Sequence, residues 1–103
     1  MIYLNKDNFK AETEISNTLI VVDFWAEWCG PCKMLAPVFE KLSEEMTDVK
    51  FCKVNVDENP ELCDEFKVSS IPTLLFIKND VLEDISVGYM TEDQLRQKIE
   101  ENK

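Results

Sequence analysis

Cys29 and Cys32 are the residues of this sequence best suited to chemistry. They stand in the stretch Trp28-Cys29-Gly30-Pro31-Cys32, between an apolar run and a run with helical periodicity. At a helix N-terminus, unpaired backbone N–H groups and the helix dipole both favour a thiolate over a thiol. Cys29 holds that position. Cys32 comes one turn later, near enough to attack a mixed disulfide on Cys29. We therefore interpret the pair as a redox motif.

Asp23 is the other candidate for chemistry, because it is the only charge in the apolar run 19–24. That run has the character of a strand covered on both faces. An isolated buried carboxylate is costly, so we expect burial to raise the pKa of Asp23. A carboxyl group of this kind beside a thiol pair is suited to proton transfer. The alternative is a core carboxylate whose hydrogen bonds are satisfied.

A zinc site is the structural alternative for the cysteine pair. A Cys₄ site usually has a second close pair, whereas Cys52 and Cys63 are well separated in the sequence. The flanking Trp28, the Gly-Pro between the cysteines and the following helix favour redox chemistry, so no metal is expected. Cys52 and Cys63 are interpreted as small buried hydrophobic residues.

The remaining pattern predicts a single domain, residues 1–103, of the α/β class. Strands are expected at 2–4, 19–25, 49–56, 73–77 and 81–87, and helices at 5–15, after Cys29 to 46, at 60–66 and after Thr91. Asn79-Asp80 predicts a tight hairpin, and Thr91 with Gln94 a capping box. Gly30 is expected to give its loop freedom, and Pro37 to kink its helix. The order β-α-β-α-β-α-β-β-α predicts a mixed central sheet, parallel in its first half, with helices on both faces.

Charge and hydropathy exclude several classes of function. The net charge is −10 and no basic cluster is present, which argues against binding to nucleic acid or to an anionic membrane. The first residues lack the pattern of a secretory leader, and no apolar run is long enough to cross a bilayer. A protein of the cytoplasm, or of an organelle matrix after processing, is therefore expected.

The stretch Trp25-Ala26-Glu27-Trp28-Cys29-Gly30-Pro31-Cys32-Lys33-Met34 resembles the active site of the thioredoxin family. The resemblance extends over essentially the whole chain. Further matches to the family pattern are Asp23, Pro37, Lys53 and Ile71-Pro72-Thr73. It implies the thioredoxin fold and an enzyme that reduces protein disulfides by dithiol–disulfide exchange.

The resemblance also implies roles for individual residues. Cys29 would be the attacking nucleophile and Cys32 the resolving thiol, the two forming the redox disulfide. Asp23 would exchange a proton with Cys32, and Lys53 would modulate Asp23. By sequence alone, Lys53 is equally well explained as a side chain that extends from a strand end to solvent.

A substrate-docking surface is implied in the same way. Pro72 would follow a cis peptide bond and face the cysteines, and Ile71 would offer its backbone to an extended substrate segment. The implied docking residues are Trp28, Gly30, Pro31, Ile71, Pro72 and Gly88. The family usually has a small residue after the glycine that matches Gly88, whereas this chain has Tyr89. Tyr89 is therefore expected to alter the shape of the docking surface and with it the substrate preference.

The resemblance further implies a partner, a thioredoxin reductase that re-reduces the pair, and no bound cofactor. A monomer is expected. Two alternatives stay open. One is an isomerase or oxidase on the same fold, although oxidising relatives typically carry a histidine between the cysteines and this chain has no histidine. The other is a non-catalytic binding or assembly module.

Overall fold

The computed structural model describes residues 1–103 and has the predicted order of elements. The strands are β1 (Ile2–Tyr3), β2 (Ile20–Trp25), β3 (Lys50–Asn55), β4 (Thr73–Lys78) and β5 (Val81–Val87). The helices are α1 (Phe9–Thr13), α2 (Gly30–Glu45), α3 (Pro60–Glu65) and α4 (Glu92–Asn102). The strands form one sheet in the order β1-β3-β2-β4-β5. β1, β3 and β2 are parallel, and β4 and β5 are antiparallel additions, so the predicted mixed sheet is confirmed.

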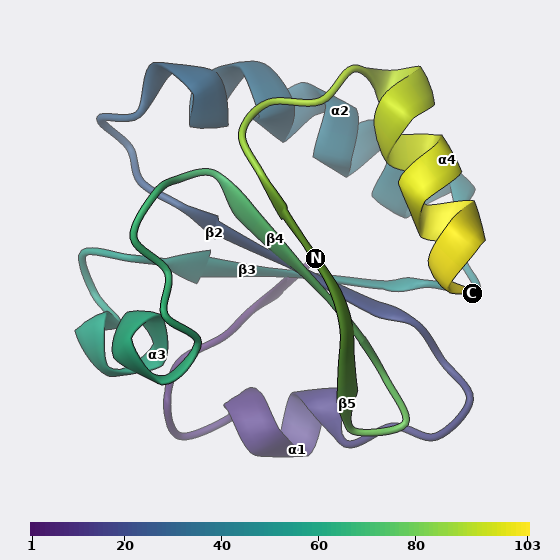
Figure 1. Cartoon of the computed structure of the whole chain (residues 1–103), viewed down its shortest axis with the longest axis horizontal. Helices are drawn as coiled ribbons and strands as arrows, with labels where there is room; N and C mark the ends of the chain where they lie inside the picture. The colour runs from purple at the N-terminus through teal and green to yellow at the C-terminus, as the bar shows by residue number, and fades with distance from the viewer.

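Helices cover both faces of the sheet: α2 and α4 lie on one side, and α1 and α3 on the other (Figure 1). Successive side chains of β2 point to opposite faces, as the strand period requires. Val21 joins the apolar cluster beneath α2 and α4, whereas Val22 joins the cluster beneath α1 and α3. Asp23, which follows Val22, consequently lies on the side of the sheet that α2 covers.

The helix that carries the cysteines is held by an apolar stripe. Leu35, Phe39 and Leu42 recur at helical spacing and are fully buried against the sheet. Pro37 lies inside α2, which continues to Glu45 as the sequence predicts. The side chain of Pro37 is exposed on the outer surface of α2. The stripe therefore fixes α2 over the end of β2 and with it the position of both cysteines.

The first helix is shorter than the sequence predicts. A helix was expected from Asn5 to residue 15, but α1 spans Phe9–Thr13. The Asn5 side chain accepts the backbone N–H groups of Asp7 and Asn8, and the Asn8 side chain accepts the N–H of Asn5. These hydrogen bonds satisfy the backbone in a turn and delay the start of the helix.

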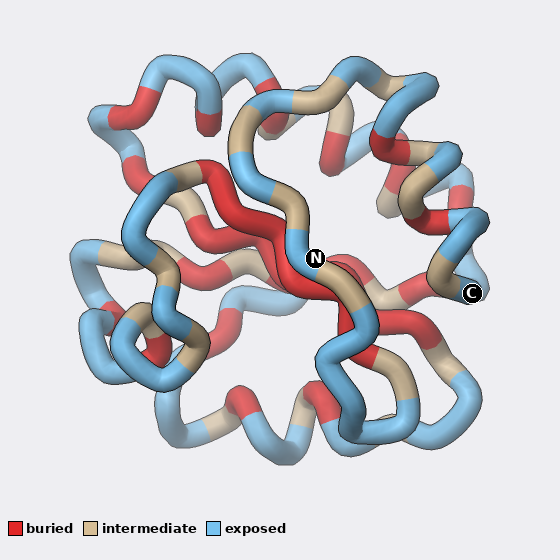
Figure 2. Tube along the Cα trace, in the orientation of Figure 1, coloured by how far each residue is buried: buried red, intermediate tan, exposed pale blue.

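The hairpin between β4 and β5 forms as predicted. Asn79 and Asp80 have φ values of 52° and 65°, the left-handed angles that a two-residue turn requires. β5 is the edge strand, and its residues are mostly exposed (Figure 2). Glu83 is exposed on this edge, whereas Asp84 turns toward α4 and pairs with Lys98 at 3.0 Å.

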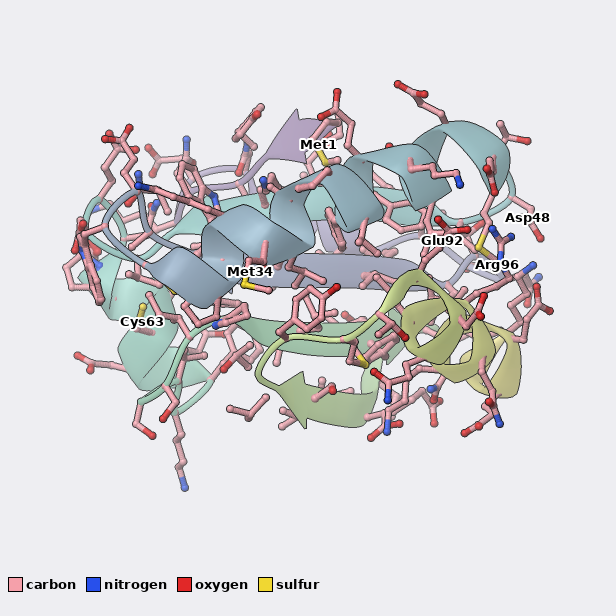
Figure 3. The ribbon with its side chains drawn as sticks, turned by 90° about the horizontal axis from the view of Figure 1, so that it is seen from above. Met1, Met34, Asp48, Cys63, Glu92 and Arg96 are labelled. Atoms are coloured by element: carbon pink, nitrogen blue, oxygen red, sulfur yellow. A yellow bond between two sulfur atoms is a disulfide. The ribbon has the colours of Figure 1, made fainter.

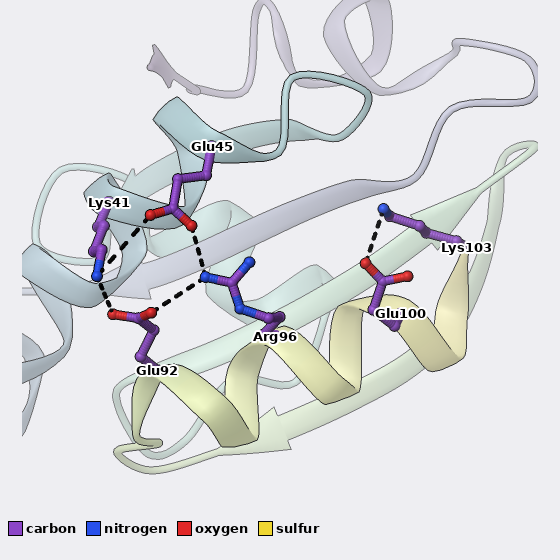
Figure 4. Close-up of polar contacts among 6 residues, drawn as sticks. All are labelled: Lys41, Glu45, Glu92, Arg96, Glu100 and Lys103. Carbon is purple, nitrogen blue, oxygen red and sulfur yellow. Dashed lines mark hydrogen bonds and ion pairs between the residues drawn. The ribbon is translucent and has the colours of Figure 1, made fainter.

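An ion-pair network joins α2 to α4 (Figure 4). The Glu92 carboxylate accepts hydrogen bonds from the Lys41 ammonium at 2.8 Å and from the Arg96 guanidinium at 3.2 Å. The Arg96 guanidinium also pairs with the Glu45 carboxylate at 2.6 Å. All four side chains are at least partly exposed, so solvent and salt screen these pairs. The buried Ile99, which points from α4 into the apolar cluster, therefore contributes more to holding the helix than the network does.

The contributions of the buried Ile99 and of the ion-pair network to stability can be compared with two variants on the same helix. Ile99→Ala should lower the free energy of unfolding by about 2–5 kcal/mol, because it removes buried methyl groups and leaves a cavity. Arg96→Gln should lower it by much less, and its effect should shrink further as salt is added. Urea denaturation at low and high ionic strength checks both. A larger loss for Arg96→Gln than for Ile99→Ala would contradict this assignment.

Candidate functional site

The two cysteines lie where β2 gives way to α2. Cys29 caps the N-terminus of α2 and Cys32 lies in its first turn, and the two form a disulfide with their Cα atoms 5.2 Å apart. The Sγ atom of Cys29 accepts the backbone N–H of Cys32 at 3.2 Å. We expect this donor and the helix dipole to stabilise a thiolate on Cys29 in the reduced protein. In the disulfide form, Cys29 is 5% exposed and Cys32 is 4% exposed, so Cys32 is hardly more buried than its partner.

The residues between the cysteines serve the helix start. Pro31 occupies the first turn of α2, where its missing N–H leaves no hydrogen bond unmade. Gly30 was expected to give the loop conformational freedom, but it is the first helical residue and its φ is not positive. A Cβ atom on Gly30 would meet no atom within 4 Å. Glycine therefore leaves the surface beside Cys29 open and is not required by the backbone.

Asp23 is buried in the middle of the sheet, 1% exposed. Its Cα partners are Lys53 on β3 and Leu74 on β4, and its Oδ1 atom has no hydrogen-bond partner. Burial raises the pKa of Asp23 to about 7, and the positive charge of Lys53 opposes part of that rise. The expectation of a raised pKa from the sequence is confirmed.

Lys53 does not form an ion pair with Asp23. Its Nζ atom lies 5.0 Å from the centroid of the Trp25 ring, over the indole face. Trp25 and Lys53 line a cavity of about 190 Å³, and Cys32 lies on the same wall. Asp23 is not among the lining residues. Lys53 therefore lies across the strands from Asp23 and lines a cavity together with the second cysteine.

A loop before β4 forms the other side of the site. The Ile71–Pro72 peptide bond is cis, as the family resemblance implies. The carbonyl oxygen of Ile71 lies 3.8 Å from the Sγ atom of Cys29. Gly88 donates its backbone N–H to the carbonyl oxygen of Pro72 at 2.8 Å, and its φ of 98° favours glycine. These contacts place Ile71 beside Cys29 and tie Gly88 to the loop through Pro72.

Trp28 borders the pair on its solvent side and is 69% exposed. Its indole N–H donates to the Oδ2 atom of Asp57 at 2.9 Å. Sequence reasoning missed Asp57, because nothing in the local pattern links a residue after β3 to one before α2. This hydrogen bond fixes the orientation of an otherwise exposed ring.

Cys52 and Cys63 do not join the site. Both are free thiols, and burial raises the pKa of Cys52 to about 11. Met34 and Cys63 lie toward the end of the molecule where α2 begins, far from the labelled Glu92 and Arg96 (Figure 3). No group of three or more Cys, Asp or Glu side chains is arranged to hold a metal ion. None of the helices has the length and apolar character needed to cross a membrane.

Comparison with known proteins decides the family. The family model described as Thioredoxin matches residues 1–101. Thioredoxin from Bacillus subtilis is 47% identical over 91 residues, covering 87% of this chain and 86% of that protein. Thioredoxin from Acidithiobacillus ferridurans is 42% identical over 96 residues, covering 92% and 89%. Thioredoxin from Rickettsia typhi is 46% identical over 89 residues, covering 85% of each.

The chain belongs to the thioredoxin family. The resemblance drawn from the active-site stretch is thereby confirmed, together with the thioredoxin fold. The activity that belongs to the family, reduction of protein disulfides by dithiol–disulfide exchange, is also that of this chain. Thioredoxins do this chemistry with the cysteine pair itself and hold no bound cofactor.

The raised pKa of Asp23 gives the protein a distinctive dependence of stability on pH. The carboxyl group titrates at 3.8 when unfolded and at about 7 when folded, so between these values only the folded state holds the proton. Stability contributed by this group should therefore fall as pH rises from about 4 to about 7 and stay low above that range. At 1.36 kcal/mol per pH unit, the loss is on the order of 4 kcal/mol.

Asp23→Asn mimics the protonated carboxyl group at every pH and supplies the comparison. Its free energy of unfolding should match the wild type near pH 4 and exceed it near pH 8, as measured by urea denaturation of the oxidised proteins. A constant difference between the two proteins across this range would show that Asp23 does not titrate as its burial requires.

Proposed function

We propose that Cys29 is the attacking thiolate and Cys32 the resolving thiol in the reduction of protein disulfides. One observation carries this assignment. Cys29 caps the sixteen-residue helix α2 and accepts a backbone N–H there, whereas Cys32 lies within the helix. The helix terminus favours negative charge on the first sulfur more than on the second.

The exchange proceeds in two displacements. The Cys29 thiolate attacks one sulfur of the substrate disulfide, whose S–S bond breaks and releases the first substrate thiolate. Cys32 then gives up its proton and attacks the Cys29 sulfur of the mixed disulfide. That bond breaks, the second substrate thiolate leaves, and Cys29 and Cys32 are left as a disulfide. Two electrons pass from the pair to the substrate.

Asp23 is the proposed acceptor of the Cys32 proton in the second displacement. A general base works best when its pKa lies near the working pH, and burial raises the pKa of Asp23 to about 7. Lys53 is the proposed modulator, since its charge opposes that rise. The space lined by Lys53 and Cys32 is the proposed route for the proton.

The proposed docking surface surrounds Cys29. Ile71 offers its backbone to an extended substrate segment, and its carbonyl oxygen 3.8 Å from the Cys29 sulfur supports this role. The exposed ring of Trp28 is held by Asp57 at the border of the surface. The remaining proposed docking residues are Gly30, Pro31, Pro72 and Gly88.

We also propose the setting in which the protein works. A thioredoxin reductase returns electrons to the Cys29–Cys32 disulfide, and the protein acts as a monomer of a single domain, residues 1–103. The cytoplasm is the proposed compartment. Two free thiols outside the pair, Cys52 and Cys63, support a reducing environment.

The roles of the two cysteines can be separated by trapping. With reduced Cys32→Ser and insulin as the disulfide substrate, a mixed disulfide on Cys29 should accumulate, because the second displacement is blocked. Cys29→Ser should neither accumulate this species nor reduce insulin. Mass spectrometry of the non-reduced digest identifies the bonded cysteine.

Cys63→Ser is the matched control, since it removes a partly exposed free thiol that is not bonded to the pair. It should reduce insulin at the wild-type rate. Reduction of insulin by Cys29→Ser, or trapping through Cys32 in that variant, would overturn the proposed roles.

A further inference from the structure

The ammonium group of Lys53 occupies an unexpected position. Lys53 and Asp23 are Cα partners on adjacent parallel strands, so their side chains rise from the same face of the sheet. Opposite charges so placed attract strongly when solvent is excluded. The Nζ atom nevertheless lies over the Trp25 ring, 5.0 Å from its centroid, and the Oδ1 atom of Asp23 has no partner.

Trp25 is well placed to compete for this ammonium. It stands two residues after Asp23 on β2, so its side chain rises from the same face. Trp25 packs partly buried against the cluster that contains both cysteines. Indole has the most favourable aromatic face for a cation, and partial burial strengthens the attraction.

We propose that Trp25 is a positioning residue whose indole face holds the Lys53 ammonium away from Asp23 and so leaves the buried carboxyl group without an ion pair. The consequence for catalysis rests on the proposed function: an unpaired Asp23 stays basic enough to take the Cys32 proton. The contact itself is independent of that role.

Other charged groups near the cavity define the alternatives. Lys53 faces Asp23 from β3, and Cys32 and Lys33 approach from α2. Glu27, in the turn before α2, lines the same cavity and could also attract a released ammonium. On the β4 side the neighbour of Asp23 is Leu74, which carries no charge. Asp23 is the carboxylate directly across the strands from Lys53, so it is the expected acceptor once the indole is removed.

The test measures the pKa of Asp23 directly, by following its carboxyl carbon with NMR during a pH titration. The oxidised protein is used, because disulfide-bonded cysteines do not titrate. In Trp25→Leu, Lys53 should reach the carboxylate and lower the pKa of Asp23 by about one pH unit, the smaller end of the effect of a close opposite charge. Trp25→Phe keeps a weaker aromatic face and should lower the pKa of Asp23 by less. This variant replaces Trp25→Leu in the test if Trp25→Leu does not fold.

A double-mutant cycle shows whether the effect passes through Lys53. In a Lys53→Met background, Trp25→Leu should leave the pKa of Asp23 unchanged. Trp28→Phe, a change in the exposed tryptophan, should leave it unchanged in the wild-type background. An unchanged or raised pKa in Trp25→Leu, or an equal fall in the Lys53→Met background, would overturn the proposal.

These outcomes are separable from failure of the proposed function. The NMR titration requires no substrate and no reduction step, so loss of insulin reduction in any variant does not alter its result. Conversely, the titration could show that Trp25 controls the pKa of Asp23 while Asp23→Asn resolves mixed disulfides at the normal rate. That pair of results would keep this inference and refute the catalytic role of Asp23.

Discussion

The carboxyl group of Asp23, buried in the central strand without an ion pair, is the constraint on which the site depends. Water normally stabilises a carboxylate, and the neighbours of Asp23 on β2 and β4 are apolar. Burial of the charged form is unfavourable, so Asp23 keeps its proton up to about pH 7. A group that would merely destabilise the core at higher pH thereby becomes available for proton transfer.

The sheet and its helices fix the positions of the groups that take part in this chemistry. β2 is paired on both sides, so its end is fixed, and the apolar stripe of α2 fixes the helix that begins there. The Cys29 sulfur consequently meets two backbone groups, the N–H of Cys32 and the carbonyl oxygen of Ile71. The loop before β4 is tied back by Gly88, so the side of the site that would receive substrate is also held by the sheet.

Features that depend on local sequence were predicted best. The left-handed angles at Asn79 and Asp80 and the capping box of Thr91 with Gln94 follow from neighbouring residues, and both are present. The raised pKa of Asp23 followed from one charge in an apolar strand. The cis bond before Pro72 was accessible only through the family resemblance, because an Ile-Pro step reads equally well as an ordinary strand entry.

Contacts between distant segments could not be predicted in the same way. The hydrogen bond from Trp28 to Asp57 and the position of Lys53 over Trp25 depend on which of several rotamers a long side chain adopts after folding. The early start expected for α1 failed because Asn5 and Asn8 satisfy each other in a turn. A pattern of residue types does not distinguish that turn from a helix cap.

The pH dependence of the resolution step tests the central claim most directly. A mixed disulfide is formed between Cys29 and a chromophoric thiol, and its release by Cys32 is followed by stopped-flow absorbance. If Asp23 takes the Cys32 proton, the rate should rise with a midpoint near the Asp23 pKa of about 7. In Asp23→Asn the midpoint should move toward that of an ordinary thiol, about 8.5, with a lower rate at pH 7. Identical midpoints and rates in the two proteins would contradict the account.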